Sequence, residues 1–245
     1  ELGSPAWPPK KQKELAHRYM LGLYKILENI TSNFPDILFE SCSGGGGRFD
    51  GGMLYYMPQT WTSDDTDAIE RLKIQEGTSL VYPSISMGSH VSAVPNHQVN
   101  RITPLSTRGI VAMAGSFGYE LDVTKMTDIE KEEVKKQIEL YKSIRKVVQF
   151  GDLYRLKSPF KSNEVSWMTL SKDKEFAIVS YVKQYSEVNK IPGRLKLKAL
   201  DENSLYEIIE TKEVFGGDEL MYIGLEIGEL IGDYVSKMWT LKKCK

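Results

Sequence analysis

Cysteine and histidine are both scarce in this chain of 245 residues. Cys42 and Cys244 are the two cysteines, and three histidines occur. Two cysteines this far apart do not suggest a disulfide framework. His90 and His97 fall in one predicted loop, but further ligands at the spacing of a metal site are not evident. We interpret both as hydrogen-bonding loop residues and expect no metal or other cofactor.

Long apolar runs and a strong excess of one charge are also absent. The chain has 41% hydrophobic residues, 27% charged residues and a formal net charge of −1, as ordinary globular proteins do. It has no run long enough to span a membrane and no basic excess for nucleic acid or acidic lipid. The segment Glu1 to Lys13 lacks the apolar core of a signal peptide. We therefore expect a cytoplasmic protein with no membrane or nucleic-acid partner.

Helical and extended patterns alternate in the first part of the chain. Helices are predicted at Pro8–Asn33, Thr66–Gly77, Leu105–Ala114 and Thr127–Gln149. Strands are predicted at Ile37–Phe39, at the end of Met53–Trp61, at Leu80–Pro83 and at Tyr119–Asp122, with a long loop at Ser84–Pro104. This alternation indicates a parallel α/β structure, and four strands make half of a (β/α)8 barrel.

A different pattern begins near Gly151. Strands are predicted at Glu175–Val182, Gly193–Ala199, Leu205–Glu210 and Tyr234–Leu241, with a turn at Gly216–Asp218. We expect two domains, residues 1–152 with the C-terminal half of the barrel and residues 153–245 with an antiparallel, sandwich-like β domain. Half a barrel has open edges and an unfilled interior, so a partner segment, the N-terminal half of the barrel, is expected.

Two polar loops follow predicted strands. One holds Cys42-Ser43-Gly44-Gly45-Gly46-Gly47-Arg48, and the other holds Ser63-Asp64-Asp65-Thr66-Asp67. In a barrel such loops converge on one mouth, and carboxylates there suit the cleavage of sugars. From the residues alone, helix capping is the favoured explanation of the aspartates, and a flexible loop explains the glycines. Cys42 has no His/Asn pair to make it a nucleophile.

Five motifs together resemble the α-galactosidases of glycoside hydrolase family 36. The first two contain the loops just described, and the others are Met87-Gly88-Ser89-His90-Val91-Ser92, Pro95-Asn96-His97-Gln98 and Phe117-Gly118-Tyr119-Glu120-Leu121-Asp122. The resemblance runs from about Glu1 to about Leu156. It implies a retaining hydrolase of terminal α-galactosides of the melibiose and raffinose type, active without a cofactor and assembled as a homotetramer.

The resemblance also implies roles for individual residues. Asp64 aligns with the general acid/base, and Asp65 and Asp67 are left as capping or positioning groups. The backbone and side chains of Cys42, Ser43, Gly44 and Gly45 are expected around the galactose ring. Arg48 is expected to hold the loop or Asp50 rather than substrate.

The sequence departs from the family in one important respect. The family's Lys-Trp-Asp-Met-Asn-Arg motif, which carries the nucleophilic aspartate, does not occur here. We therefore expect the C-terminal part of a larger enzyme, inactive alone. Ile110 stands where the family often has an acidic residue. A non-catalytic protein that binds sugar or a partner, or an α-galactosyl transglycosylase, remains an alternative.

Further residues near the predicted strand ends allow two readings. Trp61 suits either the core or a sugar platform. Glu40 and Asp122 stand at strand ends from which a side chain can reach the barrel mouth. Aromatic residues of the second domain are more often core than a carbohydrate-binding face; they are Trp167, Phe176, Tyr181, Tyr185 and Trp239.

Overall fold

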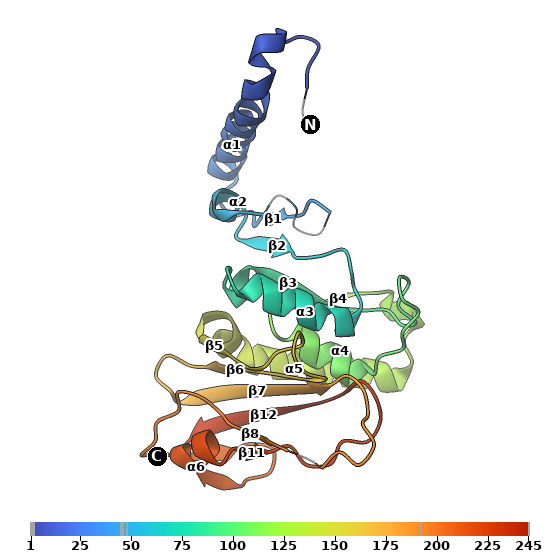
Figure 1. Cartoon of the computed structure of the whole chain (residues 1–245), viewed down its shortest axis with the longest axis vertical. Coiled ribbons are helices and arrows are strands. Elements are labelled where there is room, and N and C mark those ends of the chain that lie inside the picture. Colours follow the sequence, from blue (N-terminus) through green and yellow to red (C-terminus); the bar gives the residue numbers. More distant parts are fainter. Residues whose placement is uncertain (1–2, 45–46, 48, 192, 245) are drawn as a thin grey trace.

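A computed structural model of the chain describes residues 3–44, 47, 49–191 and 193–244. It begins with a 3-10 helix at Pro9–Glu14 and helix α1 at Leu15–Asn33, which projects from one end of the molecule (Figure 1). Pro9 begins the first turn, where its missing N–H costs nothing. Helix α1 buries Leu27 alone among its residues, so its apolar face has little cover within the described chain.

Four parallel strands form the first sheet, in the order β1-β2-β3-β4. Their bounds are β1 Glu40–Ser41, β2 Gln59–Trp61, β3 Met87–Ser92 and β4 Ser116–Glu120. Helices alternate with them: α2 Gly51–Tyr56, α3 Ala68–Ser79, α4 Leu105–Ala112 and α5 Asp128–Phe150, with 3-10 turns at Ser84–Ser86 and Val123–Lys125. This is the expected half of a (β/α)8 barrel.

Two of the predicted strands lie elsewhere. The third strand was expected at Leu80–Pro83, but Leu80 and Val81 are exposed in a turn and the strand is β3 at Met87–Ser92. The prediction was wrong because it looked for an apolar run, whereas β3 consists largely of small and polar residues. The strand is buried because it lies between β2 and β4 and under helices. The first strand was expected at Ile37–Phe39, yet it consists of Glu40–Ser41, and Ile37 and Leu38 are exposed.

The second sheet is antiparallel, in the order β10-β9-β12-β7-β6-β5. Its strands are β5 Asp152–Lys157, β6 Glu164–Leu170, β7 Phe176–Lys183, β9 Leu205–Ile208, β10 Val214–Gly216 and β12 Val235–Lys243. A two-stranded ribbon pairs β8 Arg194–Leu195 with β11 Leu225–Glu226. The expected turn at Gly216–Asp218 is wrong, because helix α6 begins there and spans Gly217–Tyr222.

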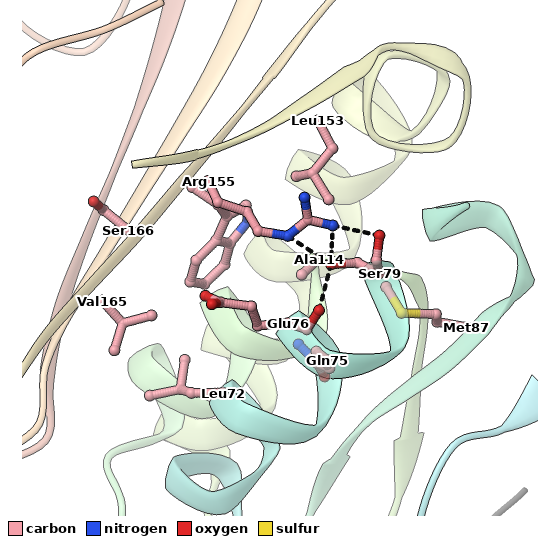
Figure 2. A pocket seen from close by; sticks show the side chains of 11 residues that line it. Leu72, Gln75, Glu76, Ser79, Met87, Ala114, Leu153, Arg155, Val165 and Ser166 are labelled. Carbon is pink, nitrogen blue, oxygen red and sulfur yellow. Dashed lines mark hydrogen bonds between the residues drawn. The ribbon is translucent and has the colours of Figure 1, made fainter. Parts of the chain in front are cut away.

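Helices α3 and α4 connect the two sheets. Ile69, Leu72 and Val111 from these helices share a buried cluster with Val165 and Val182 of the second sheet. A small cavity of about 40 Å³ lies at this contact. Figure 2 shows the side chains that line it, among them Arg155, which donates to the hydroxyl of Ser79 at the end of α3. A continuous apolar contact of this kind fixes the sheets relative to each other. The expected boundary between residues 152 and 153 stays a prediction.

Membrane insertion through a helix is not supported in the described ranges. None of their helices is both long enough and apolar enough to cross a bilayer.

Candidate active site

The inner face of the parallel sheet is identified by what lies on the opposite face. On β3, Ser89 donates to Gln75 of α3, and Val91 packs on Leu105 of α4. These residues therefore face the helices. Since side chains alternate along a strand, Gly88 and His90 face the other way, into the barrel interior.

An aromatic stack lines this inner face. The rings of Trp61 and His90 stack with centroids 4.4 Å apart, and each covers a glycine of the next strand. A Cβ at Gly88 would lie 3.3 Å from the indole of Trp61, and one at Gly118 would lie 2.8 Å from the imidazole of His90. The two glycines thus let both rings lie flat against the sheet.

His90 is not the loop residue that the sequence predicted. It belongs to β3, whereas His97 is exposed in the following loop. Burial lowers the pKa of His90, so its ring is neutral at pH 7. Its Nδ1 atom is buried without a partner among the described residues. No group of three or more His, Cys, Asp or Glu side chains in the described ranges has the geometry to hold a metal ion.

Asp64 and the glycine loop come together at the mouth. Asp64 follows β2 and is exposed, and a Cβ at Gly44 would lie 4.0 Å from its Oδ2 atom. Gly44 has φ +56°, a conformation that favours glycine. The thiol of Cys42 is free and exposed, and Ser43 accepts a hydrogen bond from Gly47 N–H at 3.1 Å. Gly45 and Arg48 lie outside the described residues.

The carboxylate of Asp64 differs from those of Asp65 and Asp67 in having no partner among the described residues. No described residue donates a hydrogen bond to it or forms an ion pair with it. Asp67 caps α3, because its Oδ1 accepts from Ile69 N–H at 3.0 Å and Glu70 N–H at 3.1 Å, and it also pairs with Arg101. Asp65 Oδ1 accepts from Asp67 N–H at 3.0 Å. The interpretation of Asp65 and Asp67 as capping or positioning groups is therefore confirmed, with Asp67 as the cap of α3.

Arg71 of α3 lies beneath the Asp64 loop and is 2% exposed. Its guanidinium donates to the carbonyls of Ser63 and Asp65, both at 3.3 Å, and to Thr62 Oγ1 and Gly88 O, both at 2.9 Å. It also lies over the Trp61 ring. Burial lowers the pKa of Arg71 to about 10, so the group stays charged at neutral pH. Carbonyl and hydroxyl oxygens bind this buried charge, and the carboxylates of Asp65 and Glu120 favour it without forming an ion pair among the described residues.

Gln98 contacts the same loop from the β3–α4 connection. Its Nε2 donates to Asp64 O at 3.0 Å, and its Oε1 accepts from Thr66 N–H at 3.1 Å. Neither Arg71 nor Gln98 was predicted to belong to the site. Gln98 stands in one of the five motifs, but the partners of both side chains lie up to 34 residues away in sequence, and the local pattern does not show what they bind.

Two other candidate residues have local roles. Glu40 lies on β1 and accepts from the side chain of Gln59 on β2. Asp122 caps the turn at Val123–Lys125 by accepting from Thr124 N–H at 3.0 Å. Of the aromatic residues in the second sheet, Trp239 and Tyr181 are core, each 2% exposed.

Comparison with known proteins places both parts of the chain. The family model Melibiase matches residues 1–151, and that of the glycosyl hydrolase family 36 C-terminal domain matches residues 164–241. The chain is 61% identical over 242 residues to the α-galactosidase AgaA of Geobacillus stearothermophilus, covering 99% of this chain and 33% of that protein. It is 53% identical over 235 residues to the α-galactosidase Mel36A of Lactobacillus acidophilus, and this match covers 96% of this chain and 32% of that protein.

Solved structures agree with these matches. A crystal structure of an AgaA variant in complex with raffinose superposes with a TM-score of 0.96 at 59% identity, covering 100% of this chain and 34% of that chain. The chain thus spans about a third of the length of these relatives. The fold is the C-terminal half of a (β/α)8 barrel followed by an antiparallel β domain, and the chain belongs to the Melibiase family, glycoside hydrolase family 36.

Proposed function

We propose that the protein carrying this chain is a retaining α-galactosidase that hydrolyses terminal α-galactosyl residues of melibiose- and raffinose-type oligosaccharides. The observation that carries this proposal is the exposed carboxylate of Asp64 beside Gly44, just after the carboxyl end of β2, to which none of the described residues binds. Family membership and the raffinose complex of a relative support it.

Asp64 serves as the general acid and then as the general base. In the first step its carboxyl proton goes to the glycosidic oxygen as the bond to the anomeric carbon breaks. A nucleophilic aspartate from outside these 245 residues bonds to that carbon at the same time. In the second step Asp64 takes a proton from water, whose oxygen displaces the enzyme carboxylate and restores the α configuration. The reaction needs no cofactor.

The glycine loop binds the sugar in this proposal. Cys42, Ser43, Gly44 and Gly45 surround the galactose ring, and backbone amides there donate to its hydroxyls. The free, exposed thiol of Cys42 and the closeness of Gly44 to Asp64 support this placement. The homotetramer and the cytoplasmic location stay predictions.

The substitution Asp64→Asn in the full-length enzyme tests the assignment. We expect hydrolysis of raffinose to fall by a factor of about 10²–10⁴, the usual contribution of a general acid/base. An aryl α-galactoside with an activated leaving group still forms the glycosyl-enzyme, because that step needs little acid. Azide should then restore turnover and give an α-azide, since azide needs no base to attack.

The matched control is Asp65→Asn, one residue along the same loop. It should have a smaller effect and no azide rescue, because Asp65 binds the backbone of Asp67. Near-normal hydrolysis of raffinose by Asp64→Asn would contradict the assignment. Product analysis with an acceptor sugar separates hydrolysis from transglycosylation.

A further inference from the structure

We propose that Gln98 is a positioning residue for Asp64: its side-chain amide holds the peptide groups beside Asp64 and so directs the acid/base carboxyl toward the glycosidic oxygen. The inference rests on the proposed function, because it assigns a partner to the same acid/base.

The loop at Thr62–Asp67 is held by side chains along its length. Arg71 binds the carbonyls of Ser63 and Asp65 from the helix side, and Gln98 binds Asp64 O and Thr66 N–H from the other loop. Four successive residues of the loop therefore have a backbone group bound by one of two side chains. Such a loop has a single geometry as long as both side chains are in place.

The two bonds of Gln98 act directly on the geometry at Asp64. The direction of the Asp64 carbonyl depends on the backbone dihedrals of Asp64, and these also set the direction of its Cα–Cβ bond. The amide of Gln98 uses its donor and its acceptor on the two sides of Asp65, as a peptide group of a neighbouring strand would. No described residue binds the Asp64 carboxylate, so the constraint that the described residues place on it is the position of its Cβ, which the loop backbone sets.

Gln98 is itself fixed by a buried residue. Asn96 is 3% exposed, and its Oδ1 accepts from Gln98 N–H at 2.9 Å and from Val99 N–H at 3.1 Å. Its Nδ2 donates to Thr66 Oγ1 at 3.1 Å. Among the described residues, four side-chain hydrogen bonds thus join the β3–α4 loop to the Asp64 loop: two involve Gln98, one comes from Asn96, and one comes from Arg101 to Asp67.

The reaction itself supplies a readout specific to positioning. A sugar leaving group needs a proton as the bond breaks, whereas an activated aryl leaving group departs with little help. A displaced Asp64 therefore lowers kcat/KM, which reports formation of the glycosyl-enzyme, much more for raffinose than for the aryl substrate. General loss of folded enzyme lowers both equally.

The experiment compares Gln98→Met, which keeps the length of the side chain and removes both hydrogen bonds, and Gln98→Ala in the full-length enzyme. We expect kcat/KM for raffinose to fall about tenfold or more, because displacements of about 1 Å cost up to 10²-fold. For an activated aryl α-galactoside, kcat/KM should stay within about twofold of the value of the unaltered enzyme. His97→Ala is the control, since His97 is exposed in the same loop, and it should leave both values unchanged.

Each outcome decides the question. A larger loss for raffinose than for the aryl substrate supports the positioning role. Equal losses for both substrates, or no loss, would overturn it. An unaltered enzyme without α-galactosidase activity would contradict the proposed function instead. Hydrogen exchange of the Thr66 amide then still tests whether Gln98 holds the loop, because Thr66 N–H donates to Gln98. If Gln98→Met leaves this exchange unchanged, the positioning role is overturned without reference to activity.

Discussion

At the scale of single residues, Gly118 determines whether the aromatic stack can form. A Cβ there would lie 2.8 Å from the imidazole of His90, closer than side chains pack. We predict that Gly118→Ala pushes His90 off Trp61 and lowers the free energy of unfolding by about 1–3 kcal/mol, the usual cost of overpacking. Thermal melts measure this loss. Gly77→Ala is the control, because no atom lies within 4 Å of that Cβ. An equal loss in both variants would contradict the prediction.

The residues of the candidate site differ in how far the sequence reveals them. Asp64 and Asp67 stand in one short motif, and their carboxylates predict both capping and acid/base chemistry. The structure assigns the cap to Asp67, and none of the described residues binds the Asp64 carboxylate. The residues next to Arg71 and Gln98 in the sequence do not show what these two side chains bind. They become part of the site because the fold brings α3 and the β3–α4 loop to the same place, which local patterns do not encode.

At the scale of elements, helix α5 has the best-defined beginning. The Thr127 hydroxyl accepts from Glu130 N–H at 3.3 Å, and the Glu130 carboxylate accepts from Thr127 N–H at 2.9 Å. The bonds that the Glu130 carboxylate accepts from the Thr127 backbone N–H and, second, from the Thr127 hydroxyl lower the pKa of Glu130. Because the lowered pKa favours folding at neutral pH, this contribution is lost as the pH falls through the range in which Glu130 takes up a proton.

We predict that Thr127→Ala lowers the free energy of unfolding by about 1 kcal/mol. The melting temperature should then fall by about 2–4 °C, as expected for a protein of this size. Exchange of the amides in the first turn of α5 should be faster. Ser143→Ala is the control within the same helix, because the Ser143 hydroxyl binds only the carbonyl of Leu140 among the described residues. A control loss as large as that of Thr127→Ala would contradict a capping role.

Helices and strands were not equally predictable. Helix α5 was predicted close to both of its ends and α1 at its C-terminal end, because apolar residues repeat every three to four positions. The predicted start of α1 at Pro8 was wrong, since the residues from Pro9 to Glu14 form a 3-10 helix and α1 begins at Leu15. The strand at Met87–Ser92 was missed, because its burial comes from neighbouring strands and helices rather than from its own apolar residues. Leu80 and Val81 are apolar, yet they lie exposed in a turn. Hydrophobicity alone is therefore a poor guide to the strands of a barrel.

At the scale of the whole molecule, apolar surface gathers around α1 and the start of the parallel sheet. Leu21 is 56% exposed, Ile26 57% and Leu38 71%. Strand β1 is also an edge strand within the described sheet. The expectation that half a barrel lacks cover on its open side agrees with this surface, which suits the remaining strands and helices of a complete barrel.

We predict that the 245-residue chain produced alone associates and binds a hydrophobic dye, because exposed apolar patches promote association. Replacing two of these residues together, Leu21→Glu with Ile26→Lys, should reduce both the sedimenting oligomers and the dye fluorescence. The control is Ile231→Lys, which removes a still more exposed residue (83%) from the second domain and should change neither. In a full-length enzyme the double variant should instead impair assembly, because the same face is then buried. A monomeric, dye-free chain in analytical ultracentrifugation would show that α1 finds its cover within these residues, and it would remove the case for a partner segment on this face.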